Sequence, residues 1–399
     1  MPLKQSQVLS LLQTRRSDFK RFDQSAAIVK RYREAWAAAA SDFSELARSR
    51  SVRAAHSSDF SGTVGPLAAV PLEKVASQAI PFEIELTNQE ERLAWARPRL
   101  TGVTTFAVDG SQIYPSKDFS IPIALIQVGW YENQHLPASA YQKDVAVDIL
   151  TPAQLRTSGS SSQALERVVN RRRFELEIRR LIKYMQEHRQ DGSRTLVFYD
   201  GSLIASFAET QDPESREFYV QNLRQLLHTS ERCRVPLVGY IDTTTARDLT
   251  ETLRELFALP EMPGLNDAQL LHPQMQWDSR TGLWRCQRPG ILKEYGSWAD
   301  KIAFCYLKTN DGYPARLEMP IWIYEDRKDS LLERAIDWVM GEVIIGRGYP
   351  YAIETADQTA VLQAKDRQLF YQLLQDWADK EKLNLRLSRK MVSKVRRRS

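Results

Sequence analysis

The residues of this chain best suited to chemistry are two Asp-Gly-Ser tripeptides, each preceded by a run of β-branched and aromatic residues. Asp109 follows the run 104–108, and Asp200 follows the run 195–199. Such runs are typical of strands, so each aspartate is expected where a strand passes into a tight turn. Carboxylates at the ends of neighbouring strands can share a hard divalent cation. The pair predicts a site for metal-dependent phosphodiester hydrolysis, while a single copy could also be an ordinary Asp-Gly turn.

A third carboxylate is expected on a long charged helix predicted for residues 163–188. Glu175 and Glu177 lie on opposite borders of its buried face, so either of them could reach the aspartates. Each could instead pair with a neighbouring arginine. The buried face itself is predicted to contain Phe174, Ile178, Leu181 and Met185.

The segment 348–357 supplies a fourth element. Pro350 suits the first turn of a helix, and Tyr349 precedes it, placed to donate to a phosphate or to orient a water. Asp357 falls on the predicted buried side of this helix, where an unpaired carboxylate is costly unless a metal, a hydrogen bond or an arginine relieves it. That side is predicted to contain Ile353, Ala356, Ala360, Val361 and Ala364.

Strands and helices alternate along the part of the chain that must position these residues. The first strand and the runs at 120–131 and 146–150 predict an antiparallel meander, and the helix at 163–188 leads to the strand that ends at Asp200. The pattern predicts an α/β fold with a mixed β-sheet flanked by helices. The later elements are expected at 216–229, 236–241, 245–257, 302–307, 317–324, 330–340 and 350–377.

Composition shifts divide the chain into a helical arm, a connector, a main domain and a basic tail. Within the main domain, one stretch rich in Pro-Gly pairs predicts an inserted flexible region. The corresponding ranges are 1–56 for the arm, 57–80 for the connector, 81–385 for the main domain, 260–300 for the insertion and 386–399 for the tail.

Charge and composition favour a protein that binds a polyanion and argue against disulfide-rich, zinc-cluster and membrane-spanning classes. The net charge is +5, and the tail has seven Lys and Arg residues and no acid, which favours binding to a polyanion. Three scattered cysteines predict neither a disulfide framework nor a zinc cluster, so we expect a cytoplasmic protein. No apolar stretch approaches the ~20 residues needed to cross a bilayer. P-loop, GxSxG and GxGxxG motifs are absent, so any ATP hydrolysis would belong to a partner.

The order of these motifs resembles the NurA family of DNA repair nucleases. The resemblance rests on Val-Asp-Gly-Ser at 108–111, the Glu-bearing helix, Tyr-Asp-Gly-Ser-Leu at 199–203 and Tyr-Pro with a following Ala-Asp at 349–357. It implies an RNase H-like fold, and manganese-dependent 5′ to 3′ exonuclease and single-strand endonuclease activity. It also implies a homodimer that works with a HerA-like hexameric ATPase in DNA end resection and double-strand break repair.

Carried over to this chain, the resemblance assigns roles to individual residues. Asp109 and Asp200 become metal ligands, Glu175 becomes the ligand from the helix with Glu177 as its alternative, and Tyr349 becomes the aromatic active-site residue. The expected cofactor is Mn²⁺ or Mg²⁺, with two ions bound.

The sequence departs from the family pattern at two positions. Asp357 stands where family members commonly have histidine, so metal binding could be preserved but proton transfer by histidine could not. Asp242 follows a predicted strand where the family often has lysine, and we expect it to cap the following helix.

Two functions remain open from the sequence. In the first, a metal-dependent deoxyribonuclease uses Asp109, Asp200, Glu175 and Asp357 as ligands. Its DNA backbone contacts are then expected from Arg171, Arg172, Arg173, Arg396, Arg397 and Arg398. In the second, a non-catalytic DNA-binding scaffold recruits a motor ATPase, which the departure at Asp357 favours and the two motif aspartates disfavour. No residue pattern predicts recognition of a 2′-hydroxyl, so the choice of DNA over RNA rests on the resemblance.

Overall fold

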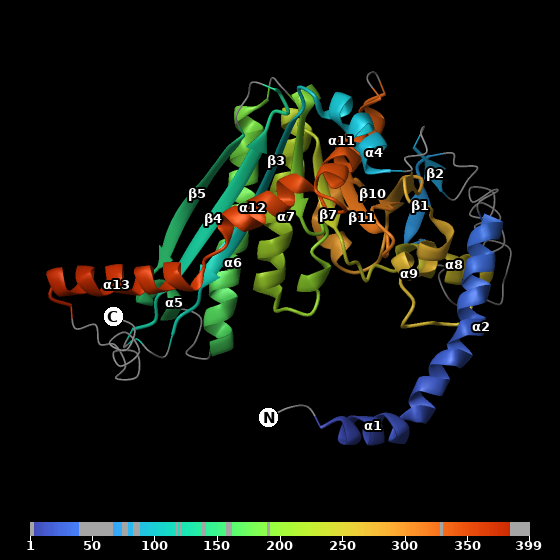
Figure 1. The fold of residues 1–399 in the computed structure, drawn as a ribbon, viewed down its shortest axis with the longest axis horizontal. Coiled ribbons are helices and arrows are strands. Elements are labelled where there is room, and N and C mark those ends of the chain that lie inside the picture. The colour runs from blue at the N-terminus through green and yellow to red at the C-terminus, as the bar shows by residue number, and fades with distance from the viewer. Residues whose placement is uncertain are drawn as a thin grey trace. The chain divides into compact units, whose positions relative to one another are not determined.

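A computed structural model describes most of the chain (Figure 1). The described residues are 4–39, 67–73, 79–82, 88–116, 119, 121–137, 141–156, 162–189, 192–327 and 330–383. Within these ranges, no helix has the length and apolar character needed to cross a membrane. The basic tail and most of the predicted connector lie outside them.

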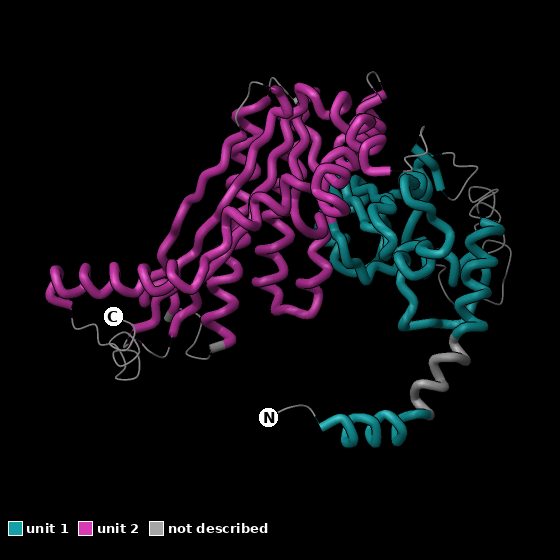
Figure 2. Tube along the Cα trace, in the orientation of Figure 1, with its two compact units in different colours: residues 1–86, 241–321 teal, residues 87–240, 322–399 magenta. Residues whose placement is uncertain are grey.

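The chain forms two compact units, shown in separate colours in Figure 2. Unit 1 contains residues 1–86 and 241–321, and unit 2 contains residues 87–240 and 322–399. Residues 241–321, which the sequence analysis placed inside one main domain, therefore group with the N-terminal residues. Every predicted ligand of the metal site belongs to unit 2.

The sheet of unit 2 is mixed, as the sequence predicts. Its described strands pair in the order β5-β4-β3-β6-β7. The first three in the chain form the predicted antiparallel meander, β6 lies parallel to β3, and β7 lies parallel to β6. The bounds are β3 (Thr104–Ile113), β4 (Ala124–Asn133), β5 (Gln142–Leu150), β6 (Thr195–Asp200) and β7 (Leu237–Ile241).

Helices cover both faces of this sheet, which confirms the predicted fold class. The predicted helix at 163–188 is α6, which packs on β3 and β4 and beside α7, while α12 crosses β3 and β4 (Figure 1). The helices are α4 (Gln89–Leu100), α5 (Pro152–Arg156), α6 (Ser162–Glu187), α7 (Pro213–Cys233), α10 (Trp322–Glu325), α11 (Leu331–Ile345), α12 (Tyr351–Ala360) and α13 (Ala364–Lys380), with short 3₁₀ turns η1 (Gly192–Arg194) and η2 (Ser206–Ala208).

Alternate residues of β3 face opposite layers of helices. Phe106 stacks on Tyr184 of α6 with ring centroids 3.6 Å apart, whereas Thr105 donates from Oγ1 to Glu342 of α11 at 2.7 Å. Because side chains alternate along a strand, Asp109 shares the face of Thr105, and Gly110 shares the face of Phe106. The first motif aspartate therefore points toward the layer of α11 and α12, and its glycine faces α6.

Unit 1 has its own antiparallel strands. They pair in the order β1-β9-β10-β11, and β8 pairs with both β2 and β10. The strands are β1 (Ala69–Pro71), β2 (Ile80–Pro81), β8 (Ser279–Arg280), β9 (Trp284–Cys286), β10 (Ile302–Leu307) and β11 (Ala315–Pro320). The helices are α1 (Gln5–Thr14), α2 (Arg16–Ala39), α8 (Asp248–Phe257) and α9 (Asp267–Leu271), with 3₁₀ turns η3 (His272–Gln274) and η4 (Ile291–Trp298).

Three elements differ from the sequence expectations. The predicted helix at 350–377 is two helices, because Val361 adopts an extended backbone with ψ 124° between them. The segment 260–300, expected to be an inserted flexible region, instead contains α9, β8, β9 and two 3₁₀ turns, and it buries side chains such as Leu271 and Trp298. Asp242 does not cap the next helix, since α8 begins at Asp248 with Arg247 at its N-cap.

Candidate metal-dependent active site

Asp109 and Asp200 lie side by side at one level of the sheet. The parallel pairing of β3 and β6 runs through Val108↔Tyr199, so the two aspartates are the next residues on the two strands. The prediction that a strand ends at the aspartate is right for Asp200 and wrong for Asp109, because β3 continues and keeps pairing with β4. The end of β6 leaves the edge of β3 open beside Asp109.

Gly201 turns the chain away directly after Asp200. Its φ of +142° is a conformation that glycine adopts readily and other residues do not. The Gly201 N–H donates to the carbonyl of Tyr240 at 3.1 Å, which fixes this turn against β7. The Asp200 residue is exposed as a result.

Asp357 comes from α12 and meets Asp109. It is exposed, so the predicted burial of Asp357 is wrong: the buried side of α12 is formed by Ala352, Ile353, Ala356 and Ala360, and Asp357 lies beside it. Burial raises the pKa of Asp109 to about 6, and the charge and hydrogen bond of Asp357 add to this effect. The Gly110 N–H and Arg173 act in the opposite direction.

Glu177, and not Glu175, is the helix carboxylate that faces the aspartates. Burial, together with the negative charges of Asp109 and Asp200, raises the pKa of Glu177 to about 8, although the charge of Arg173 acts in the opposite direction. Glu175, the preferred ligand from the family resemblance, is occupied elsewhere: its Oε2 is 2.8 Å from Nη1 of Arg172, and its Oε1 pairs with Arg179. These contacts favour Glu177 over Glu175 as the candidate ligand from α6, and the ligand role of either glutamate stays a prediction.

Gly110 lets α6 approach β3 closely enough to deliver Glu177. A Cβ on Gly110 would lie 2.3 Å from Oε1 of Glu177 and 2.7 Å from Cγ of Arg173. Arg173 also donates from Nη1 to the Gly110 carbonyl at 3.0 Å. The glycine of the first Asp-Gly-Ser is therefore required for close packing inside a strand, whereas that of the second makes a turn.

Tyr349 lies against Asp200, as its place before α12 suggests. Its hydroxyl donates to Oδ1 of Asp200 at 3.1 Å. The Tyr349 ring packs edge-on against Tyr240 with centroids 5.2 Å apart. This contact orients the phenol toward the end of β6.

Sequence reasoning missed Glu342, which ties the layers of the site together. Its carboxylate accepts from Oγ1 of Thr105 on β3 at 2.7 Å and from the N–H of Ala352, at the start of α12, at 2.8 Å. It also lies 3.0 Å from Nε2 of His135, whose side chain is 8% exposed. Burial opposes the charged imidazole, yet the hydrogen bond and charge of Glu342 raise the pKa of His135. A lone carboxylate in the apolar run of α11 was the signal for this role.

The arginines predicted to contact nucleic acid have different surroundings in the structure. Arg171 Nη1 is 3.1 Å from Glu214, and Arg172 binds Asp148 at 2.6 Å, so both arginines have intrachain partners. Arg173 belongs to the carboxylate cluster. The tail arginines Arg396, Arg397 and Arg398 lie outside the described residues.

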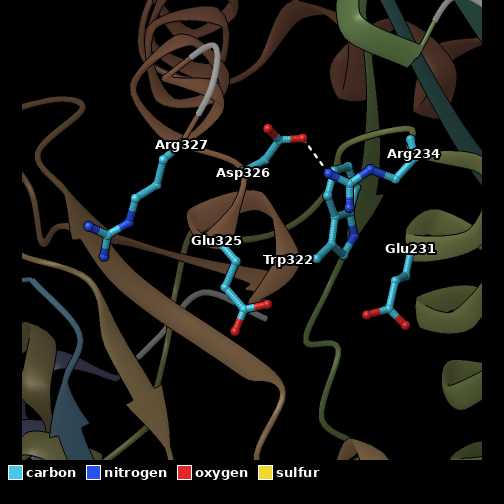
Figure 3. A pocket seen from close by; sticks show the side chains of 6 residues that line it. All are labelled: Glu231, Arg234, Trp322, Glu325, Asp326 and Arg327. Carbon is cyan, nitrogen blue, oxygen red and sulfur yellow. Dashed lines mark hydrogen bonds and ion pairs between the residues drawn. The ribbon is translucent and has the colours of Figure 1, made fainter.

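A separate hollow in unit 2 contains none of the predicted site residues (Figure 3). Arg234 pairs with Asp326 there, and its guanidinium carbon lies 4.3 Å from the centre of the Trp322 ring. Because Arg234 and Asp326 already pair with each other, we consider this hollow a weaker candidate for an active site than the carboxylate cluster. Its lining residues are Glu231, Arg234, Trp322, Glu325, Asp326 and Arg327.

The carboxylate cluster suits a divalent metal by its chemistry. Hard oxygen donors from four elements match the preferences of Mg²⁺ and Mn²⁺, and a cation would relieve the repulsion that raises the pKa of Asp109 and Glu177. In the described chain, however, no three Asp, Glu, His or Cys side chains already stand close enough to hold one ion. Metal binding by Asp109, Glu177, Asp200 and Asp357 would therefore require side-chain rotation.

Comparison with known proteins identifies a family for most of this unit. Residues 103–362 match the NurA domain. No curated protein sequence matches the chain. Among solved structures, the chain is similar to the catalytic domain of human Endonuclease V, with 13% identity, a TM-score of 0.32 and coverage of 74% of this chain and 92% of that chain. At that TM-score the likeness carries no functional argument.

Proposed function

Because the chain belongs to the NurA family of nucleases, we propose that it is a divalent-metal-dependent deoxyribonuclease. The observation that carries the proposal is that carboxylates from β3, α6, β6 and α12 act on one another: Asp357 on Asp109, and both Asp109 and Asp200 on Glu177. Burial and like charge raise the pKa of two of these carboxylates, and perturbed carboxylates of this kind are typical of functional sites.

Each member of the cluster then has a role that its contacts support. Asp109, Glu177, Asp200 and Asp357 would hold two Mn²⁺ or Mg²⁺ ions, which supply an activated water and stabilise charge on the phosphate during hydrolysis. Tyr349 fixes the orientation of Asp200 through its hydrogen bond. Asp357 stands at the position of the family histidine, so it can contribute charge and oxygen ligands but not imidazole acid-base chemistry.

The direction of digestion, the endonuclease activity and the biological role are inferred from the family alone. We propose 5′ to 3′ exonuclease and single-strand endonuclease action on DNA, in end resection and double-strand break repair. A cytoplasmic location fits the three cysteines Cys233, Cys286 and Cys305, which are buried and free.

Exposed apolar side chains support the proposed partners. On α13, Leu369, Leu373 and Trp377 recur every four residues and are 54%, 58% and 51% exposed, so they form a stripe that a second copy could cover in a homodimer. On α1, which buries no residue, Val8, Leu9, Leu11 and Leu12 are exposed and would suit docking to a HerA-like hexameric ATPase.

A cleavage assay with a matched control tests the proposal. Purified wild-type protein, Asp109→Ala and Asp376→Ala are incubated with 5′-labelled single-stranded DNA in Mn²⁺, Mg²⁺ or EDTA. Asp376 is an exposed carboxylate on α13, outside the cluster. We expect cleavage by wild type and Asp376→Ala in metal only, and none by Asp109→Ala.

Three results would argue against parts of this proposal. DNA binding by all three proteins without cleavage in any metal would favour the scaffold instead. Cleavage that survives Asp109→Ala would move the active site away from the cluster. An RNA substrate cut faster than the matching DNA would overturn the choice of deoxyribonuclease while leaving the site in place.

A further inference from the structure

Arg173 occupies the part of the cluster where positive charge is needed. Its Nη1 is 2.9 Å from Oε1 of Glu177 and 4.0 Å from Oδ1 of Asp109, and it donates to the Gly110 carbonyl. Its Nε is buried and has no hydrogen-bond partner among the described residues. A guanidinium that leaves a buried N–H unsatisfied is held there by the carboxylates rather than by a complete set of hydrogen bonds.

The other arginines of this stretch of α6 behave differently. Arg172 lies between Asp148 and Glu175, and Arg179 pairs with Glu175, so these cations bind acids outside the cluster. Arg173 is the cation that offsets the negative charge at both Asp109 and Glu177. Its position therefore reflects the acidic cluster and not a general pairing of charges along the helix.

We propose that Arg173 is a counter-cation of this carboxylate cluster and competes with a divalent cation for Glu177. The inference rests on the proposed function, because it requires that the carboxylates receive a divalent ion. An ion that binds Oε1 of Glu177 must break the 2.9 Å contact with Nη1 of Arg173. Metal affinity is therefore lower than the carboxylates alone would give.

Arg173 also reduces the repulsion among the carboxylates. Its charge favours the ionised forms of both Asp109 and Glu177. Without this positive charge, the buried Glu177 and its neighbours would repel one another more strongly, because Coulomb interactions are weakly screened in a buried site. A divalent cation would supply the same compensation, so Arg173 and the cation are alternatives at Glu177.

Direct measurement of Mn²⁺ binding tests this inference without an activity assay. We would titrate wild type, Arg173→Gln, Arg173→Lys and the control Arg179→Gln with Mn²⁺ and follow free Mn²⁺ by electron paramagnetic resonance. Loss of one nearby positive charge should tighten Mn²⁺ binding by about tenfold in Arg173→Gln. Arg173→Lys should bind like wild type, and Arg179→Gln should change Kd by less than about twofold.

Thermal unfolding of the same proteins supplies a second readout. In EDTA, Arg173→Gln should melt below wild type and below Arg179→Gln, because its carboxylates lack a counter-cation. Saturating Mn²⁺ should raise its melting temperature by more than that of wild type, since tighter binding to the folded state stabilises it more. Circular dichroism in EDTA establishes that each variant is folded.

The outcomes separate this inference from the proposed function. If wild type binds Mn²⁺ and folded Arg173→Gln binds it equally or more weakly, Arg173 is part of the metal scaffold and the inference is overturned while the function stands. If neither binds Mn²⁺, both are overturned. Mn²⁺ binding by Arg173→Gln that is undetectable in wild type would be the strongest support for competition.

Discussion

Unit 1 and unit 2 each contain a cluster of acidic and basic side chains, and the two clusters differ in how their charges are paired. In unit 1, Arg316 Nη1 is 2.8 Å from Asp248, its Nε is 2.7 Å from Glu318, and Arg288 Nε is 2.9 Å from Asp248. Burial disfavours the charged form, but the two arginines hold the pKa of Asp248 below its usual value. The two guanidiniums pair with Asp248 and Glu318. A third carboxylate of this cluster, Asp267, has its pKa raised to about 6 by burial and accepts from the Tyr306 hydroxyl at 2.9 Å.

In unit 2, Arg173 lies 2.9 Å from Glu177 and 4.0 Å from Asp109, while Asp200 and Asp357 add negative charge near these two carboxylates. Here burial raises the pKa of Asp109 and Glu177, and the neighbouring acids add to the rise. Paired buried charges stabilise a single packing, whereas uncompensated ones persist where a ligand supplies the missing charge. The comparison indicates that balance, and not burial alone, separates a structural cluster from a candidate active site.

The largest expected effect is the loss of nuclease activity when a proposed metal ligand of the unit 2 cluster is removed. Asp200→Asn should lower nuclease activity at least about a thousandfold, which corresponds to the several kcal/mol that metal-ion catalysis contributes. Because Asp200 is exposed, the free energy of unfolding in EDTA should change by less than about 0.5 kcal/mol. Steady-state cleavage rates and urea titrations check the two parts. A large loss of stability in Asp200→Asn would mean that this cluster is structural too.

Removing Arg316 from the unit 1 cluster should have the opposite effect, a large loss of stability. Arg316→Met keeps side-chain volume but leaves Asp248 and Glu318 short of a partner, so we expect a loss of about 3–5 kcal/mol in the free energy of unfolding. Urea titration followed by tryptophan fluorescence measures it. Arg254→Met is the matched control, because Arg254 forms a half-exposed pair with Glu251 that is worth less than about 1 kcal/mol. Equal losses in the free energy of unfolding of Arg316→Met and Arg254→Met would mean that the buried cluster is no more important for stability than an ordinary surface ion pair.

Glu177 of unit 2 and Asp248 of unit 1 should contribute to the pH dependence of stability with opposite signs. The folded-state pKa of Glu177, about 8, exceeds its ordinary value of 4.5, so folded protein binds the extra proton between these values. Its contribution therefore makes metal-free protein less stable as pH rises through this window. The pKa of Asp248 is lowered from 3.8, so its contribution is present above that value and is lost as pH falls.

Urea titrations of Glu177→Gln and Asp248→Asn in EDTA sharpen this contrast. We compare the free energy of unfolding of Glu177→Gln with that of wild type at two pH values. The difference should shift in favour of the variant by about 1–3 kcal/mol between about pH 5 and about pH 8. Asp248→Asn should cost most stability near neutral pH and less as the solution approaches pH 3. The same pH trend in both variants would contradict the assignment of opposite charge balance.

Local patterns predicted the strand aspartates of the site well. Asp109 and Asp200 each follow a β-run, and parallel pairing of β3 with β6 was enough to bring them together. The Tyr-Pro pair marked the start of α12 and placed Tyr349 beside it. These features depend on a few consecutive residues and on one strand pairing, which is why sequence could indicate them.

Features set by tertiary contacts were beyond sequence patterns. Helical periodicity put Glu175 and Glu177 on two borders of one face, and the choice was made by the gap at Gly110 and by the arginines around Glu175. In unit 1, Asp248 and Arg316 are 68 residues apart in sequence, and no local pattern links them. Charge balance is thus a property of the fold that the sequence alone did not show.

The smallest expected effect within the unit 2 cluster concerns Tyr349. Its hydroxyl makes one hydrogen bond to Asp200, and such a bond contributes about 0.5–1.5 kcal/mol, so Tyr349→Phe should lower kcat about fivefold with KM for DNA little changed. Tyr351→Phe is the control, because Tyr351 lies two residues away on the exposed start of α12. Cleavage kinetics at saturating Mn²⁺ measure both. A thousandfold loss in Tyr349→Phe would show that the phenol takes part in the reaction directly, and no loss would show that the metal alone orients Asp200.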